Sequence, residues 1–259
     1  MRARKRFGQH FLHDPGVLDK IASAVSPRPG DHLVEIGPGR GALTHALLDA
    51  WPENATLDIV EIDRDLVPLL REELADRPFI TIHEADALEF DFAQLAAARG
   101  AGRLRVVGNL PYNISTPLLF HLLESANVID DMHVMLQREV VDRIAAAPGS
   151  ADYGRLTVML APWVEAESLF DVGPGAFHPP PKVWSAVVRL TVRREPAFTV
   201  SPHFASVVAT AFSHRRKTIR NALRDVVTAE QILACEIDLT ARPETLAPAS
   251  FNRLAHALD

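Results

Sequence analysis

Three side chains close together in the chain could hold a planar base that carries an amine: Asn109, Pro111 and Tyr112. The Asn109 amide can both accept and donate hydrogen bonds, Pro111 fixes the backbone and removes a donor, and Tyr112 offers a flat aromatic face. The same residue types are common in tight turns, where they only shape the backbone. The rest of the sequence has to distinguish a binding loop from a turn.

A glycine-rich segment, Gly37–Gly41, is the second candidate for chemistry, because glycines let the backbone approach a nucleotide-like ligand closely. Continued through Ala42, it fits the dinucleotide-binding pattern G-x-G-x-x-A, with Glu61 or Asp63 about 20 residues further on to bind a ribose. It also fits the glycine loop of S-adenosylmethionine enzymes, where the glycines admit the methionyl part of the cofactor. A purely structural turn is the third interpretation.

Asp86 and the loop around Asn109 help to separate these alternatives. Asp86 follows a predicted strand, at a position where its carboxylate could accept a hydrogen bond from an adenine amine. A dehydrogenase would instead need an acid–base residue and a nicotinamide site, and no segment supplies them with comparable clarity. The sequence therefore favours S-adenosyl-L-methionine as the cofactor.

Alternating strands and helices must position these loops. Apolar runs predict strands over residues 33–36, 57–62, 79–83, 104–107 and 132–137, and a later hairpin of 169–172 with 186–192. Helices are predicted over 15–25, after Gly41, over 64–74 and 92–99, and from Ser115, which would cap the last of them. This alternation predicts an α/β fold with a Rossmann-like, mostly parallel sheet and an antiparallel edge, whose ligands bind at the carboxyl ends of the strands.

The sequence changes character at residues 193–202, where Pro196 and Pro202 interrupt the strand pattern. From His203 onward the apolar residues recur at helical spacing. We therefore expect a catalytic domain over residues 1–195 and a small all-α domain over residues 196–259.

Positive charge is concentrated in two segments, although the net charge of the chain is −6. Residues 1–13 and 201–224 hold nine Lys and Arg residues and no acid, which leaves 18 basic against 33 acidic residues in the remainder. Such a distribution indicates two basic patches that contact phosphates on one side of an acidic protein. For the second segment a solvated helix face is an equal alternative.

The remaining composition excludes several classes of protein. Cys235 is the only cysteine, so no disulfide can form within the chain, and the eleven histidines show no zinc-binding spacing. We therefore expect no metal. No apolar run approaches ~20 residues, and the basic amino terminus is not followed by a hydrophobic stretch. These features predict a cytoplasmic protein that does not enter membranes.

An ordered series of motifs resembles the ribosomal RNA adenine dimethyltransferases of the KsgA type, which are related to the Erm resistance methylases and the mitochondrial transcription factor B proteins. The matching segments span residues 4 to about 224 in order, and they are residues 4–12, 34–39, 61–63, 84–87, 108–115, 177–183, 185–190 and 215–221. The resemblance implies transfer of methyl groups from S-adenosyl-L-methionine to adjacent adenosines near the 3′ end of the small-subunit (16S) RNA, giving dimethyladenosine during ribosome biogenesis.

The resemblance also implies roles for individual residues. The cofactor would be bound by His10, Leu12, Gly37, Glu61, Asp86 and Asn109. The family usually has Asn where this chain has His10; His can also donate a hydrogen bond, but its reach and charge differ. Ribosomal RNA would contact Arg4, Lys5, Arg6, Arg215, Arg216, Lys217 and Arg220. A monomer is expected.

The catalytic residues implied by the resemblance are Asn109, Leu110, Pro111, Tyr112 and Phe177. The Asn109 side-chain oxygen and the Leu110 carbonyl would accept hydrogen bonds from the adenine amine, and Pro111 would hold that carbonyl in place. Tyr112 and Phe177 would stack on the two faces of a base that has been turned out of the RNA. Two alternatives stay open: an Erm-type enzyme that acts on large-subunit RNA, and a nucleic-acid-binding module without catalysis.

Overall fold

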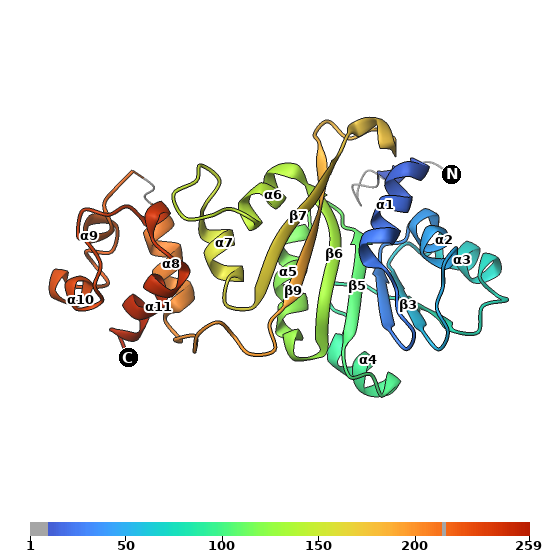
Figure 1. The fold of residues 1–259 in the computed structure, drawn as a ribbon, viewed down its shortest axis with the longest axis horizontal. Coiled ribbons are helices and arrows are strands. Elements are labelled where there is room, and N and C mark those ends of the chain that lie inside the picture. Colours follow the sequence, from blue (N-terminus) through green and yellow to red (C-terminus); the bar gives the residue numbers. More distant parts are fainter. Residues whose placement is uncertain (1–9, 214–215) are drawn as a thin grey trace. The chain divides into compact units, whose positions relative to one another are not determined.

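The computed structural model describes residues 10–213 and 216–259, and these divide into two compact units (Figure 1). The first unit lies within Met1–Val141 and Glu167–Val192, and the second within Asp142–Ala166 and Arg193–Asp259. In the described part of the chain, no helix is long and apolar enough to cross a lipid bilayer. Each unit has its own core.

The first unit has an α/β fold built on one main sheet. Among the described residues, seven strands are ordered β4-β3-β2-β5-β6-β9-β7. The neighbours from β4 to β6 pair in parallel, whereas β9 runs antiparallel to β6. The strands are β2 (His32–Ile36), β3 (Thr56–Glu61), β4 (Ile80–Glu84), β5 (Leu104–Asn109), β6 (Ile129–Gln137), β7 (Val164–Val172) and β9 (Ser185–Val192). The predicted mostly parallel sheet with an antiparallel edge is confirmed.

Helices flank the parallel strands, and the apolar spacing predicts those from α1 to α5 but not α6. They are α1 (Pro15–Val25), α2 (Ala42–Leu48), α3 (Val67–Glu73), α4 (Phe92–Arg99), α5 (Ser115–Glu124) and α6 (Arg138–Ile144), with 3₁₀ helices η2 (Ala126–Val128) and η3 (Pro174–Ala176). Asp14 caps α1 by accepting a hydrogen bond from the Val17 amide, which explains why the helix begins at Pro15.

The first turn of α5 differs from its prediction. Ser115 is the first helical residue and not the cap, because Ile114 occupies the cap position without a side-chain hydrogen bond. The Ser115 hydroxyl instead donates to the Tyr112 carbonyl, at 3.2 Å. The helix therefore follows the Asn109 loop directly, and its first hydroxyl stabilises the turn of that loop.

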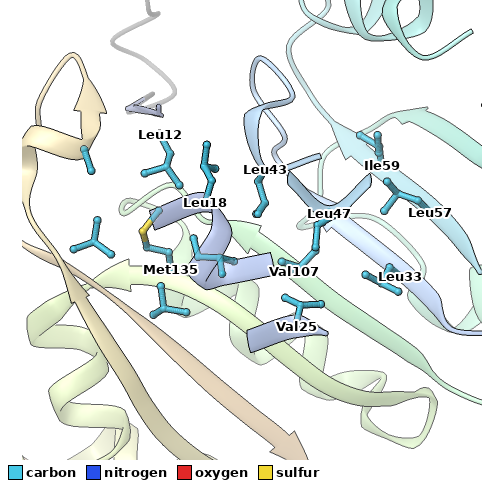
Figure 2. Close-up of a cluster of buried hydrophobic side chains, with 14 of the residues drawn as sticks. Leu12, Leu18, Val25, Leu33, Leu43, Leu47, Leu57, Ile59, Val107 and Met135 are labelled. Atoms are coloured by element: carbon cyan, nitrogen blue, oxygen red, sulfur yellow. The ribbon is translucent and has the colours of Figure 1, made fainter. Parts of the chain in front are cut away.

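One face of the sheet is covered by α1 and α2 (Figure 2). Leu18 and Val25 of α1 and Leu43 and Leu47 of α2 pack against Leu33, Leu57, Ile59, Val107 and Met135 of the strands. Because successive side chains of a strand point to opposite faces, residues such as Val34, Val60 and Val106 are buried on the other face. Burial on both faces fixes the ends of the strands, where the loops begin.

A short second sheet joins the amino-terminal part of the first unit to a distant segment. Strand β1 (Phe11–Leu12) pairs antiparallel with β8 (Phe177–His178), with Leu12 opposite Phe177. The His13 amide adds a further hydrogen bond to the Ala176 carbonyl, at 2.9 Å. This pairing holds residues 10–12 over the loops at the carboxyl ends of the main strands.

The second unit is mainly helical, with α7 (Arg155–Leu160), α8 (Phe204–Phe212), α9 (Ile219–Ala222), α10 (Ala229–Ala234), η4 (Pro243–Thr245) and α11 (Pro248–His256). Its core contains Tyr153, Phe204, Val208, Ile219, Phe251 and Leu254. Residues 142–166 belong to this unit, whereas the sequence assigns them to the first domain. The reason is long-range packing: Tyr153 is fully buried and its hydroxyl donates to the Leu246 carbonyl, at 2.7 Å.

Candidate active site

A cavity of about 260 Å³ opens at the carboxyl ends of β2, β3, β4 and β5. Its lining comes from the β1 segment and from the loop that follows each of these strands, and it includes His10, Leu12, Glu35, Gly37, Glu61, Ile62, Asp86, Asn109, Leu110, Pro111 and Tyr112. The parallel register places these loops next to one another, as expected for a ligand site in an open α/β sheet. All six residues predicted to bind a cofactor line this one cavity.

The glycine loop leaves room for a ligand and supports the closing segment. A Cβ atom on Gly37 would meet nothing within 4 Å, so this side of the loop is open. Gly39 has a φ of +60° and lies so close to the Phe11 ring that a Cβ atom would be 2.9 Å from Cδ1. Phe11 therefore packs directly on the loop backbone, and the Arg40 guanidinium lies over its ring at 5.1 Å from the centroid.

Glu61 ends β3 at the bottom of the cavity. One carboxylate oxygen accepts from the Asp63 amide at 2.8 Å and the other from the Gly39 amide at 3.3 Å. Burial raises the pKa of Glu61, although these two hydrogen bonds act in the opposite direction. Each carboxylate oxygen has two acceptor sites, so Glu61 can still accept hydrogen bonds from a vicinal diol.

Asp86 is held in a similar way after β4. Its Oδ1 accepts from the Leu88 amide at 2.9 Å, which orients the half-buried carboxylate in the wall of the cavity. Ile62, whose exposed fraction is 43%, lies in the same wall. An apolar side chain beside an oriented acceptor suits a flat heterocycle with an exocyclic amine.

Glu35 is a polar group in the cavity wall to which the sequence pattern assigns no role. It is 1% exposed, and its Oε2 accepts from the Thr44 hydroxyl at 2.6 Å. Its Oε1 is buried without a hydrogen-bond partner among the described residues. Burial raises the pKa of Glu35 to about 7, assisted by repulsion from Glu61 and opposed by the Thr44 hydrogen bond.

The Asn109 loop is fixed by contacts at its base and at its side chain. The Leu110 amide donates to the Met135 carbonyl of β6 at 3.1 Å. The Asn109 Nδ2 donates to the His10 carbonyl at 3.1 Å. This hydrogen bond uses only the nitrogen of the side-chain amide. The Asn109 oxygen is therefore still available as an acceptor at the edge of the cavity.

Gly108 brings this loop against the glycine loop. A Cβ atom at position 108 would lie 2.5 Å from the Ile36 carbonyl oxygen, closer than real Cβ atoms come. Only glycine therefore lets the end of β5 approach the end of β2 at this point. The two loops that would hold a cofactor and a base meet there.

Tyr112 is anchored at its hydroxyl and covered on its ring. The hydroxyl hydrogen-bonds to the buried Ser185 Oγ at 2.6 Å, and burial raises the pKa of the phenol. The His10 ring stacks on Tyr112 with 5.9 Å between centroids and 28° between planes. His10 Nδ1 also hydrogen-bonds to the Pro179 carbonyl, at 2.7 Å. His10 therefore joins the β1 segment to the Tyr112 loop and to the segment after β8.

Phe177 lies outside the cavity, contrary to the stacking position expected for it. Its side chain is 2% exposed and packs in the apolar core of the first unit, which also contains Leu12 and Ala176. The reason is the β1–β8 pairing, which the local sequence pattern does not reveal. In this structure the aromatic ring that accompanies Tyr112 is that of His10.

Those predicted RNA contacts that the structure describes do not line the cavity. Arg4, Lys5, Arg6 and Arg215 lie outside the described residues. Arg216, Lys217 and Arg220 are exposed on the second unit, before and within α9. Their exposure agrees with contact to a polyanion, and their role stays a prediction.

Comparison with known proteins gives one consistent family. A family model described as ribosomal RNA adenine dimethylase matches residues 1–259. The chain is 54% identical to ribosomal RNA small subunit methyltransferase A of Pseudomonas syringae pv. syringae and to that of Pseudomonas aeruginosa, covering 99% of this chain and 95% of each relative. The protein of the same name from Marinobacter nauticus is 52% identical, over 99% of this chain and 92% of the relative.

Solved structures agree in fold. The crystal structure of the 23S rRNA methyltransferase ErmE is similar with a TM-score of 0.75 and 29% identity, covering 96% of this chain and 99% of that one. A dimethyladenosine transferase from Plasmodium falciparum gives a TM-score of 0.78 at 24% identity, covering 95% and 96%. The fold is therefore similar over nearly the whole length of the chain.

Proposed function

The chain belongs to the ribosomal RNA adenine dimethylase family, and we propose that it transfers methyl groups from S-adenosyl-L-methionine to the exocyclic amines of adjacent adenosines near the 3′ end of the small-subunit (16S) RNA, during ribosome biogenesis. The observation that carries this proposal is the common cavity of Gly37, Glu61, Asp86 and Asn109. In this proposal the site for the nucleoside cofactor and the acceptor for the adenine amine would share a wall.

The residues of the cavity fit the proposed cofactor. The open space beside Gly37 suits the methionyl part, the paired oxygens of Glu61 suit the ribose hydroxyls, and Asp86 with Ile62 suits the adenine. Leu12 and His10 close the cavity from the β1 side. When bound, S-adenosyl-L-methionine supplies an electrophilic methyl group on a positively charged sulfur.

The chain's own contribution is to position a weak nucleophile. The lone pair of an adenine amine is delocalised into the ring, so hydrogen bonds from its N–H groups to the Asn109 oxygen and the Leu110 carbonyl would favour a pyramidal nitrogen with its lone pair aimed at the methyl. Tyr112 would hold the plane of the base. Its hydroxyl is engaged with the Ser185 Oγ, so the ring of Tyr112, and not its hydroxyl, would contact the base. Positioning then supplies most of the rate enhancement.

The proton released by the methylated amine needs no strong base in this site. With the amine held by Asn109 and Leu110, its nitrogen would take the methyl group as the bond from that group to sulfur breaks, and the sulfur would leave as part of a neutral thioether. The new ammonium then loses its proton readily to water. After one transfer the nitrogen keeps a single N–H, so a second transfer would use only one of the two acceptors.

The names of the relatives support small-subunit RNA as the proposed substrate. The proteins 52–54% identical to this chain are named small subunit methyltransferases, whereas the similarity to ErmE, a 23S rRNA methyltransferase, is 29%. An RNA substrate of this kind also agrees with the cytoplasmic location that we expect. The exposed cations Arg216, Lys217 and Arg220 would contact its phosphates.

The decisive experiment is to map the modified nucleotide. Purified protein and radiolabelled S-adenosyl-L-methionine are incubated with protein-free small-subunit RNA, with small subunits and with large subunits. We expect dimethyladenosine in the small-subunit RNA only. Modification confined to the large subunit would instead assign an Erm-type activity. Binding of S-adenosyl-L-methionine in a calorimeter without transfer to any RNA would favour a binding module.

A further inference from the structure

An exposed tryptophan lies beside the Tyr112 anchor in the first unit. Trp184 is 53% exposed and its neighbour Val183 is 44% exposed, in the segment that leads into β9. The next residue, Ser185, is fully buried and holds the Tyr112 hydroxyl at 2.6 Å. Because adjacent Cα atoms are about 3.8 Å apart, the tryptophan backbone is fixed next to the anchor of the Tyr112 ring.

The indole lies near Gly173, and its backbone is fixed. A Cβ atom built on Gly173 would be in ordinary van der Waals contact with the Trp184 ring, 3.6 Å from Cη2 and 3.7 Å from Cζ3. The Trp184 carbonyl accepts a hydrogen bond from the Arg138 amide, at 2.9 Å. A large aromatic surface is therefore presented to solvent by a fixed backbone.

We propose that Trp184 is a stacking platform for a nucleobase of the RNA that neighbours the target adenosine. This rests on the proposed function, because it requires an RNA whose adenine lies against Tyr112. Turning one base out of a structured RNA leaves its neighbours unstacked, and a half-exposed indole can stack on such a base. Stacking of this kind tolerates any base, since every base has a π-face.

The charges around Trp184 fit RNA as the partner. Lys182 is exposed two positions before the indole, and Arg138, whose side chain is 51% exposed, adjoins it through the backbone hydrogen bond. Arg138 also pairs with Asp171 at 3.2 Å, so Lys182 is the cation on which phosphate contact would depend most. An aromatic face next to a basic side chain is the usual composition of a single-strand-binding surface.

The test compares Trp184→Ala, Trp184→Phe and a matched control, Leu69→Ala, in the full chain. Leu69 is 52% exposed on α3 of the same unit and has no part in the cavity. We expect Trp184→Ala to weaken binding of a protein-free RNA fragment that contains the target by about 5- to 100-fold. Most of this loss should appear in KM for RNA, with the Kd for S-adenosyl-L-methionine unchanged. Trp184→Phe should retain most of the affinity, and Leu69→Ala all of it.

Fluorescence gives an independent measurement of the stacking. The chain has three tryptophans, so replacing Trp51 and Trp163 with Phe leaves Trp184 as the single indole. Stacking on a base should quench its emission when the RNA fragment is added in the absence of cofactor. Unchanged emission together with unchanged affinity of Trp184→Ala would overturn the proposal.

Two further outcomes separate this proposal from others. If wild-type protein methylates no RNA, the proposed function fails, and the platform is then judged by RNA binding and fluorescence alone. If Trp184→Ala binds protein-free RNA normally but loses activity on assembled small subunits, Trp184 contacts a ribosomal protein and the stacking proposal is wrong.

Discussion

The side-chain amide of Asn109 donates a hydrogen bond to the main-chain carbonyl of His10, with 3.1 Å between Nδ2 and O, across 99 residues of chain. This bond has two effects. It fixes the orientation of the amide so that its oxygen remains an acceptor at the edge of the cavity, and it holds the β1 segment over the same cavity. One side chain thus connects closure of the cavity to the orientation of the amine acceptor.

Replacing Asn109 with Ala should therefore impair methyl transfer much more than cofactor binding. Loss of the acceptor and of its tether should lower kcat by about 100-fold, because misplacing the amine by about 1 Å has an effect of that size. Single-turnover transfer of labelled methyl groups measures the rate, and calorimetry measures the Kd. The control is Asn127→Ala, an exposed residue of η2 that does not line the cavity, which should transfer at nearly the wild-type rate. Full activity of Asn109→Ala would remove Asn109 from the catalytic residues.

Glu35 should make the stability of the protein depend on pH. Burial raises its pKa from 4.5 to about 7, so the folded state binds more protons than the unfolded state between these values. The free energy of unfolding should therefore be unaffected below about pH 4.5 and fall as the pH rises to about 7, by up to about 3 kcal/mol. Urea unfolding of wild type and Glu35→Gln at pH 5, 6 and 8 measures this.

The free energy of unfolding of Glu35→Gln should not decline over this pH range. The amount by which it exceeds that of wild type should therefore grow from pH 5 to pH 8. Thr44→Val is a companion variant that removes the hydrogen bond favouring the charged carboxylate. It should raise the pKa further and extend the decline to higher pH. Parallel pH curves for wild type and Glu35→Gln would show that Glu35 does not titrate in this range.

Gly108→Ala should damage both stability and catalysis. The added Cβ atom would lie 2.5 Å from a backbone oxygen, so β2 and β5 would have to move apart. We expect a loss of about 1–3 kcal/mol in the free energy of unfolding and a lower rate of methyl transfer. Gly102→Ala is the matched control, because a Cβ atom there meets nothing within 4 Å. Equal effects of the two substitutions would contradict a specific steric constraint at Gly108.

The exposed cations near α9 should govern the salt dependence of RNA binding. Replacing Arg216, Lys217 and Arg220 with Ala should weaken RNA binding and reduce the slope of log K against log salt by about 0.7–0.9 for each phosphate that the variant no longer neutralises. The Kd for S-adenosyl-L-methionine should not change, because these residues belong to the other unit. Filter binding over a range of salt concentrations measures the slope, and loss of cofactor binding would contradict separate roles for the two units.

The sequence could predict the parts of the site that follow a local pattern. Gly37, Glu61, Asp86 and Asn109 each lie just after or at the end of a strand, and the parallel order of the strands brings such positions together. Their placement in one cavity is therefore a consequence of periodicity and loop position. Their individual roles toward cofactor and base stay predictions.

Interactions between distant segments could not be predicted in the same way. The pairing of Leu12 with Phe177 buries an aromatic ring that was expected to stack on the base. The bond from Tyr112 to Ser185 joins a loop to the first residue of β9, 73 residues away. Residues 142–166 join the helical unit through the buried Tyr153. No local spacing encodes these interactions, because they depend on which surfaces meet in the folded chain.

The β1–β8 pairing also determines when the cavity can be completed during synthesis. His10, Phe11 and Leu12 leave the ribosome early, but their partners at positions 177–179 follow much later in the chain, since His10 and Pro179 are 169 residues apart. Strand β9, which anchors Tyr112, follows later still. A nascent chain can therefore form the parallel strands β2 to β5 without yet having a closed site. A chain truncated before β8 would also lack β9, so it would lose both the antiparallel edge of the sheet and the cover of the cavity.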